Sequence, residues 1–264
     1  MSNKPGGKRN PLAAAERADR NRKIFIQVAV AVVLVGLVAA IGIGIAVKNA
    51  RKNDPGPTPA IAATAPQNPN GVVASITDTG AIRIGKPDAK VTVRVVADLQ
   101  CPACKAFEAA NAQALTDAVD SGTAIVEYNI ISFLDKASTT KYSSRAANAS
   151  YCVAESDPTK YLNWLTTMFA QQPAEGSAGL TDDQLITIAQ QAGFTDPAVA
   201  QCVKDNKYSK YVQAKTKAVF DTGVKSTPTI YVNGTEVNSQ QIATPAGQFA
   251  PGAMTAVITA AAAK

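Results

Sequence analysis

The chain of 264 residues carries 26 Lys and Arg against 20 Asp and Glu, and it contains no histidine. Its basic surplus is concentrated at one end, because residues 1–23 hold seven Lys and Arg and three more follow at Lys48, Arg51 and Lys52. From Asn53 onward 16 basic residues stand beside 18 acidic ones, which argues against nucleic-acid binding by that part of the chain.

An uncharged stretch of 24 residues runs from Ile24 to Val47. A helix of this length crosses a bilayer, so we predict a cytoplasmic, disordered tail over 1–23 and a transmembrane helix over 24–47. The excess of basic residues before the span predicts a cytoplasmic N-terminus and an extracytoplasmic remainder. A cleaved signal peptide is the alternative, but the apolar run is longer than the usual signal core, which favours a single-pass anchor in the cell membrane.

Residues 48–71 are rich in proline and predict an extended, semi-rigid linker that holds the following domain away from the membrane. We expect one folded domain over 72–264.

The domain begins with the pattern of an α/β fold. A β-branched run at 91–97 is typical of a buried central strand, and a short strand at 81–85 precedes it. Residues 105–121 have a helical apolar face, and 123–133 is a second β-rich run. Strand, helix and strand predict a βαβ unit.

The pattern then turns helical over about 139–222, where we expect four helices. Strand character returns at 229–232, and Asn233-Gly234 followed by 235–237 predicts a tight hairpin. The alanine-rich segment 251–264 predicts a closing helix. The expected fold is therefore a sheet core with a helical insertion, preceded by one transmembrane helix.

A Cys-x-x-Cys motif, Cys101-Pro102-Ala103-Cys104, stands between the strand at 91–97 and the helix that follows it. We expect Cys101 to be the N-cap and Pro102 the first helical residue, so that free N–H groups and the helix dipole favour an exposed thiolate at Cys101. Cys101 is then the nucleophile and Cys104, one turn later, the resolving cysteine. A dithiol in this position predicts thiol-disulfide oxidoreductase chemistry.

Half of a zinc site and a static disulfide are the alternative interpretations of such a motif. Zinc requires four ligands, and the chain offers no histidine and only two further cysteines, which stand alone at Cys152 and Cys202. We therefore expect no metal, and the dithiol reaction implies no cofactor.

Cys152 and Cys202 lie in two expected helices of the insertion. In an oxidising compartment four cysteines are expected to form two pairs, which favours a structural disulfide between them over two buried free thiols. Asp98 and Glu127 lie in or beside expected strands and are candidates for shuttling the proton of the resolving cysteine. For either carboxylate a solvated acid at a strand end is the alternative, and the pattern favours it over the shuttle.

Three motifs together resemble the DsbA-like branch of the thioredoxin superfamily, and the chain resembles a membrane-anchored bacterial member of it. They are Asp-Leu-Gln-Cys-Pro-Ala-Cys at 98–104, Gly-Val-Lys-Ser-Thr-Pro-Thr at 223–229, and Asn-Gly at 233–234. The resemblance covers about residues 80 to 264. It implies a thioredoxin-like sheet with a helical insertion, a cis peptide bond before Pro228 that faces the dithiol, and a substrate groove lined by Thr227.

The chain departs from the strongly oxidising members of this family at Ala103, where they carry histidine. Without a cation at that position, we expect the pKa of Cys101 to be lowered less and the couple to be less oxidising.

The resemblance implies disulfide formation in unfolded or reduced exported proteins, with reoxidation by a membrane partner of the DsbB or vitamin K epoxide reductase type. Two alternatives stay open. The same fold acts as a reductase or isomerase if its potential is low, or the domain is a non-catalytic, chaperone-like peptide-binding module with a vestigial dithiol.

Overall fold

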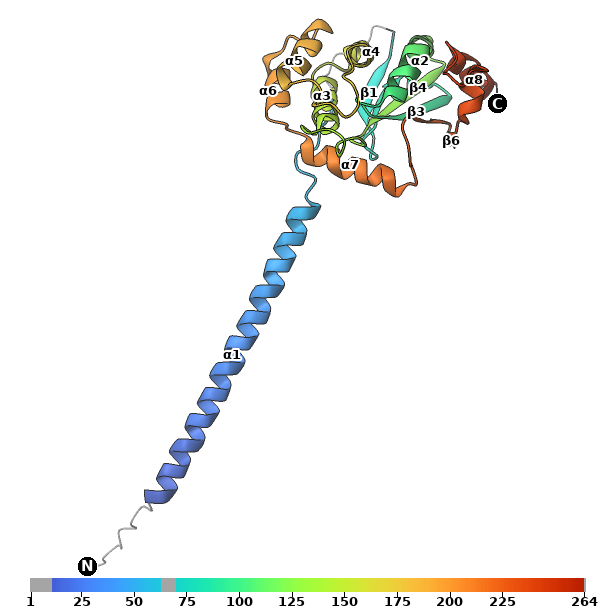
Figure 1. Cartoon of the computed structure of the whole chain (residues 1–264). Helices are drawn as coiled ribbons and strands as arrows, with labels where there is room; N and C mark the ends of the chain where they lie inside the picture. The colour runs from blue at the N-terminus through green and yellow to red at the C-terminus, as the bar shows by residue number, and fades with distance from the viewer. Residues whose placement is uncertain (1–10, 63–69, 264) are drawn as a thin grey trace, which may run out of the picture. The chain divides into compact units, whose positions relative to one another are not determined.

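A computed structural model describes residues 11–62 and 70–263 of the chain. The chain divides into two compact units, residues 1–54 and 55–264. The first unit consists of helix α1, Pro11–Asn53, and the second contains all other helices and strands (Figure 1).

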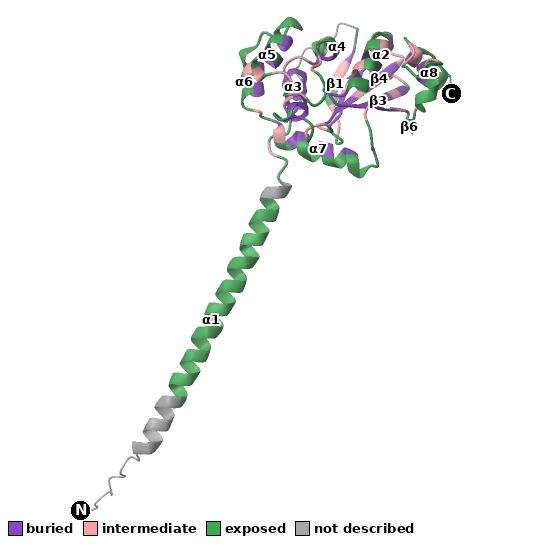
Figure 2. Cartoon of the chain, in the orientation of Figure 1, coloured by how far each residue is buried: buried purple, intermediate pink, exposed green. Residues whose placement is uncertain are grey.

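Helix α1 contains a segment, Arg20–Ala50, that is long and apolar enough to cross a membrane by length and composition; a stretch of 18 residues within it has a mean hydropathy of 2.9. Its valine, leucine and isoleucine side chains are exposed from Ile24 to Val47 (Figure 2), as expected for a helix that packs against lipid rather than protein. The helix begins at Pro11, so the predicted disordered tail is wrong for residues 11–23. Ala13, Ala14 and Ala15 are strong helix formers, and the helix continues back from the span through them. Residues 1–10 of the predicted tail lie outside the described residues.

The second unit is built on a six-stranded mixed sheet with the order β1-β2-β4-β3-β5-β6. Its strands are β1 Val73–Ile76, β2 Ile82–Gly85, β3 Val91–Ala97, β4 Ala124–Ile130, β5 Thr229–Val232 and β6 Thr235–Glu236. Strands β3 and β4 are parallel, with Val93 opposite Val126, and all other neighbouring pairs are antiparallel. The βαβ prediction is confirmed. Strand β1 is a short edge strand that the sequence pattern did not indicate.

Both faces of the central strands are buried, which explains their nearly continuous runs of apolar residues. Val93 and Val95 of β3 join the main core on one face, whereas Val96 packs with Ile131 and Val219 on the other. Because β3 and β4 are parallel, their carboxyl ends meet at one edge of the sheet. The loop that follows β3 ends at Cys101, and Cys104 lies in the first turn of the next helix.

Helix α2, Pro102–Ser121, returns across the main core and packs against β4. Cys101 is its N-cap and Pro102 its first residue, as the sequence predicts. Gly122 ends it in the left-handed conformation, with a φ of 78°, which favours glycine.

The insertion contains five α-helices instead of the four expected. They are α3 Tyr142–Ser156, α4 Tyr161–Ala170, α5 Asp182–Gln191, α6 Pro197–Lys204 and α7 Ser209–Asp221, with a 3₁₀ turn η1, Pro158–Lys160, before α4. The break between α6 and α7 carries neither glycine nor proline. It occurs at Asn206, which has a φ of 49° in a region that asparagine tolerates better than most residues.

The chain after the insertion follows the prediction more closely. Asn233 and Gly234 form a two-residue turn with positive φ at both positions, and Tyr231 pairs with Glu236 across it. A second 3₁₀ turn η2, Ser239–Ile242, leads to the closing helix α8, Ala253–Ala262, which packs on α2.

Residues 55–62, predicted as part of a free linker, belong to the second unit. Pro59 is buried, and a cavity of about 630 Å³ lies between this segment, β1 and α7. Proline favours an extended chain but does not prevent that chain from packing on a neighbouring surface, which explains the difference from the predicted spacer. Residues 63–69 of the predicted linker lie outside the described residues.

Candidate active site

The two cysteines of the motif lie at the amino end of α2 as free thiols. Cys101 is 9% exposed and Cys104 is 1% exposed, whereas Pro102 and Ala103 between them are exposed. The sequence led us to expect an exposed sulfur at Cys101. The sulfur of Cys101 is more buried than expected because the loop before β5 packs against it.

That loop contains Thr227 and Pro228, and the peptide bond between them is cis. The Sγ of Cys101 donates a hydrogen bond to the backbone carbonyl of Thr227 at 3.3 Å. The Thr227 hydroxyl is also buried. It has no hydrogen-bond partner among the described residues while Cys101 is a thiol, and it donates to the sulfur once Cys101 is ionised. Residues 126 positions apart in the sequence thus form one site, with the proline loop directly over the nucleophile.

The pKa of Cys101 is lowered to about 6 from its ordinary value near 9. The largest cause is a hydrogen bond from the Cys104 thiol, and the Thr227 hydroxyl and the N–H groups of Cys104 and Ala103 add to it, while burial opposes it. Burial is the largest cause that raises the pKa of Cys104 well above its ordinary value. At neutral pH the site therefore holds one thiolate and one thiol, which are the states a nucleophile and a resolving group need.

Asp98 lies in the loop before Cys101 and is fully buried. Its carboxylate accepts hydrogen bonds from the N–H groups of Gln100 and Leu134, each at 2.8 Å, and from the Ser143 hydroxyl at 2.7 Å. Burial raises its pKa to about 6, and the nearby Cys101 adds to the rise. Asp98 thus ties the dithiol loop to the segment after β4 and to α3, in addition to being a candidate proton acceptor.

The structure does not bring Glu127, the other proposed proton shuttle, to the dithiol. Its side chain pairs with Arg83 on β2 in the middle of the sheet. Because side chains alternate along a strand, Glu127 points away from the main core that Val126 and Tyr128 join on either side of it and that also holds both cysteines. The proposed role is wrong for Glu127 for that reason.

Sequence reasoning missed Glu108, a carboxyl group one turn after Cys104 on α2. Glu108 is 3% exposed, and its Oε1 atom has no hydrogen-bond partner among the described residues. Burial raises its pKa to about 7. A signal was present, since position 108 follows Cys104 by four residues and therefore lies on the apolar face of the helix.

Two glutamines from different parts of the chain complete the surroundings of Cys101. The Nε2 atom of Gln172, in the loop after α4, donates to the backbone carbonyl of Cys101 at 3.0 Å. Gln100 is fully buried, and its Nε2 donates to the carbonyls of Ala174 and Ser177, each at 3.2 Å. No local pattern in the sequence indicated the contact of Gln172.

The remaining cysteines lie in the insertion, away from this site. A disulfide joins Cys152 of α3 to Cys202 of α6, with a distance of 5.8 Å between their Cα atoms. It connects two helices that pack against each other. Among the described residues, no group of three or more His, Cys, Asp or Glu side chains is placed to hold a metal ion.

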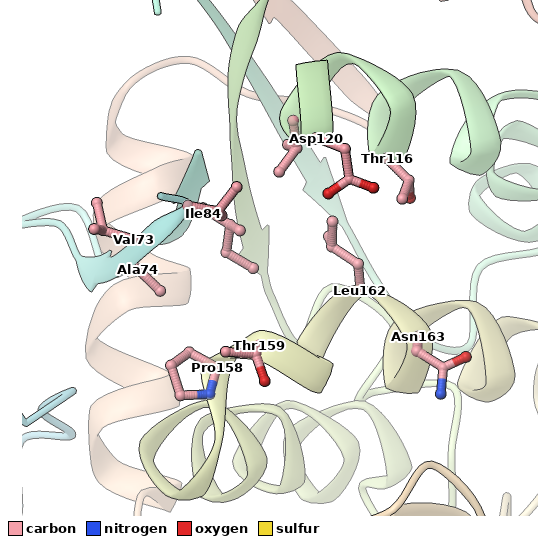
Figure 3. Close-up of a pocket in the computed structure, with 11 residues that line it drawn as sticks. Val73, Ala74, Ile84, Thr116, Asp120, Pro158, Thr159, Leu162 and Asn163 are labelled. Carbon is pink, nitrogen blue, oxygen red and sulfur yellow. The ribbon is translucent and has the colours of Figure 1, made fainter. Parts of the chain in front are cut away.

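A pocket of about 180 Å³ lies elsewhere in the second unit, between β1, β2, the end of α2 and the start of α4. Figure 3 shows Thr116 and Asp120 of α2 on one side of it and Leu162 and Asn163 of α4 on the other. None of the residues that line it belongs to the dithiol loop or the proline loop, so the cavity is separate from the candidate active site.

Comparison with known proteins agrees with this geometry. A family model described as "Thioredoxin" matches residues 77–246. The crystal structure of reduced DsbA from Mycobacterium tuberculosis is 31% identical, with a TM-score of 0.57 over 70% of this chain and 93% of that chain.

Two curated proteins add to the comparison. Serine/threonine-protein kinase PknE of M. tuberculosis is 31% identical over 166 residues, which are 60% of this chain but only 29% of the kinase. The chain thus spans less than a third of the length of that relative. Disulfide bond formation protein D of Bacillus subtilis is 28% identical over 152 residues, which are 57% of this chain and 66% of that protein. With its mixed sheet, its dithiol at the start of α2 and these similarities, the chain belongs to the thioredoxin family, in the DsbA-like branch of thiol-disulfide oxidoreductases.

Proposed function

We propose that the protein is a membrane-anchored thiol-disulfide oxidoreductase that forms disulfides in exported proteins. The observation that carries the proposal is the position of Cys101 Sγ at the amino end of α2, 3.3 Å from the Thr227 carbonyl of the proline loop. At that position the Cys104 thiol and the first N–H groups of α2 stabilise a thiolate at Cys101, while Cys104 stays protonated.

The reaction begins with the Cys101–Cys104 disulfide. A substrate thiolate attacks Cys101 Sγ, the bond between the two enzyme sulfurs breaks, and Cys104 leaves as a thiolate that takes up a proton. A second substrate thiolate then attacks the substrate sulfur of this mixed disulfide, and Cys101 leaves as the stabilised thiolate. The substrate loses two electrons and gains a disulfide, and the enzyme is left as the dithiol.

The substrate class follows from the surface beside the dithiol. A groove of about 430 Å³ lies next to Pro228, and its lining is mixed polar and apolar: Ser226, Pro228, Thr229, Ile230, Glu236, Val237, Asn238, Ser239, Ile242 and Phe249. Such a groove suits an extended polypeptide whose backbone hydrogen-bonds to the proline loop and whose side chains are not closely specified. We therefore expect unfolded or reduced polypeptides as substrates, bound weakly and with little sequence preference.

The Cys104→Ala variant tests the proposal. In this variant the Cys101 thiolate attacks a disulfide in a substrate, binds one of its sulfurs and releases the other as a thiolate. Without the resolving thiol, this mixed disulfide should accumulate and disappear on reduction. Non-reducing electrophoresis of cells that express the full chain measures this. The matched control is Cys101→Ala in the same background, which should trap nothing. If the Cys104→Ala chain captures no protein through a disulfide, the non-catalytic peptide-binding alternative replaces the enzyme.

The direction of catalysis depends on the redox potential of the dithiol. A value near about −120 mV supports disulfide formation, and one near about −270 mV supports the reductase alternative. The lowered pKa of Cys101 favours the oxidase because it stabilises the reduced enzyme. Equilibration of the full chain with glutathione buffers measures the potential.

The proposed location is the cell membrane, with the second unit outside the cytoplasm. The apolar segment of α1 supports an anchor, and the seven basic residues before Ile24 support a cytoplasmic N-terminus. Reoxidation of the dithiol requires an electron acceptor, and we propose a quinone-linked membrane protein of the DsbB or vitamin K epoxide reductase type as the partner.

This orientation predicts that a membrane-impermeant maleimide labels a cysteine placed at an exposed position of the second unit in intact cells. The exposed Lys217 offers such a position, and Asn3→Cys is the matched control at the opposite side of the membrane. In a background with Ser at 101 and 104, we expect Lys217→Cys to be labelled before lysis and Asn3→Cys only after lysis. The reverse order of labelling would contradict the proposed topology.

A further inference from the structure

The loop between α4 and α5, residues 171–181, meets the dithiol from the insertion side. Two side-chain amides hold it there. Gln172 donates from the loop to the Cys101 carbonyl at 3.0 Å, and Gln100 donates from the dithiol loop to two carbonyls of residues 174 and 177. Lys105 contacts the end of α4 beside this loop, from its Nζ atom to the Ala170 carbonyl at 3.4 Å.

The carbonyl that Gln172 binds is part of the peptide between Cys101 and Pro102, where α2 begins. It also accepts the first hydrogen bond of the helix, from the N–H of Lys105 at 3.1 Å. Pro102 has no N–H, so nothing can hold this peptide plane from its nitrogen side. The hydrogen bonds to its carbonyl therefore set the orientation of this peptide. That orientation affects Cys101 directly, because the Cα of Cys101 belongs to the same peptide unit.

The orientation of the Cys101–Pro102 peptide affects the position of the sulfur, because the short Cys101 side chain has few rotations that could compensate for a change in the backbone. A rotation of the Cys101–Pro102 peptide changes the backbone angles of Cys101 and moves Sγ relative to the N–H groups of Ala103 and Cys104. It also moves Sγ relative to the Thr227 carbonyl, which it now contacts at 3.3 Å. The backbone before Cys101 is already held, because the Gln100 N–H binds Asp98.

We propose that Gln172 is a positioning residue of the dithiol, whose side-chain amide fixes the Cys101–Pro102 peptide and thereby holds Cys101 Sγ against Thr227 and the first amides of α2. The inference rests on the proposed function, but its expected effect on the titration of Cys101 can be measured without catalytic turnover. It makes the insertion part of the redox site.

A series of substitutions at Gln172 in the full chain tests this. Gln172→Met has similar length but no donor, so the thiolate should lose stability: the midpoint of Cys101 titration should rise, and the equilibrium constant for substrate oxidation should fall about three- to tenfold. Gln172→Glu keeps the size but brings a negative charge towards Cys101 and should shift both quantities further. Gln172→Arg restores a donor and should return the titration to the wild-type midpoint or below it.

Gln171 offers a matched control in the same loop. Its amide donates to the Gln191 side chain at 2.9 Å, and its side chain is exposed. Gln171→Met and Gln171→Glu should leave the titration and the equilibrium constant unchanged, whereas they change the composition of the loop as much as the Gln172 variants do.

The readouts are thiolate absorbance near 240 nm as a function of pH and equilibration with glutathione. If Gln172→Met matches the wild type in both, or if all variants lose thermal stability with an unchanged titration, Gln172 is only a packing contact and the inference fails. Failure of the proposed function would instead appear as the absence of mixed disulfides in the Cys104→Ala chain, with the Cys101 titration still measurable. The two failures are therefore distinguishable.

Discussion

Reduced protein is expected to carry Cys101 as a thiolate at pH 7, with a titration midpoint near 6. At that midpoint about 90% of the sulfur is ionised at pH 7, against about 1% for a thiol at its ordinary value near 9. The hydrogen bond from Cys104, the Thr227 hydroxyl and the first amides of α2 are the cause. Absorbance near 240 nm, compared between reduced and oxidised protein across pH, measures the ionised fraction.

Two variants serve as controls for this titration. Cys104→Ala removes the donor with the largest effect, so its midpoint should rise towards 9, and Cys101→Ser should abolish the low-pH step. The expected gain in exchange rate is much smaller than the gain in thiolate, because a more acidic thiol is also a weaker nucleophile. A wild-type midpoint near 9 would show that the helix end and the proline loop do not stabilise the thiolate.

The lowered pKa of Cys101 makes the stability of the reduced protein depend on pH. Between about pH 6 and pH 9 the folded, reduced protein binds fewer protons than the unfolded chain does at Cys101. Its contribution to stability is therefore fully present above pH 9 and is lost as the pH falls through 6. Reduced wild type should gain stability over Cys101→Ala across this interval as the pH rises, whereas the oxidised protein, whose sulfurs do not titrate, should not.

Replacement of both insertion cysteines, Cys152→Ala with Cys202→Ala, is expected to lower the free energy of unfolding by up to about 4 kcal/mol. The reason is the separation of 50 residues between them, since a cross-link over a loop of this length removes much of the entropy of the unfolded chain. Urea unfolding of the second unit within the full chain, followed in detergent micelles, measures the change.

The control for this prediction separates the two sulfur pairs. In a background with serine at both 101 and 104, a reductant should lower the unfolding midpoint of the parent chain but leave the Cys152→Ala/Cys202→Ala chain unchanged. In the wild-type background the double variant should keep the Cys101 titration, because neither cysteine of the disulfide is within the dithiol site. A parent chain that does not respond to reductant would contradict a stabilising role for this disulfide.

Features whose signal is local could be predicted from the sequence. The apolar segment of α1 needs only its composition, and Pro102 at the start of α2 needs only the conformational preference of proline. The two-residue turn at Asn233-Gly234 is equally local, since few other residue pairs adopt positive φ twice in succession. In each case the neighbouring residues alone decide the conformation.

Features that depend on packing were missed or placed wrongly. Strand β1 forms because β2 offers it an edge, and residues 55–62 lie on the second unit because β1 and α7 provide a surface for Pro59. The position of Glu127 in the middle of β4 could be inferred, but which face of the sheet it occupies depends on the register of β4 against its neighbours. Nothing within a few residues of these positions carries that information.

The sequence by itself determined that this protein has a dithiol at the start of a helix, after a buried strand and beyond an apolar span, because each of these depends on residues that are adjacent in the chain. Only the tertiary structure decided what surrounds the sulfur of Cys101. Thr227 reaches the sulfur, and Gln172 reaches the backbone carbonyl of the same residue, from 126 and 71 positions away. Burial, which raises the pKa of Cys104 and of Glu108, exists only once the helices and the sheet have excluded water.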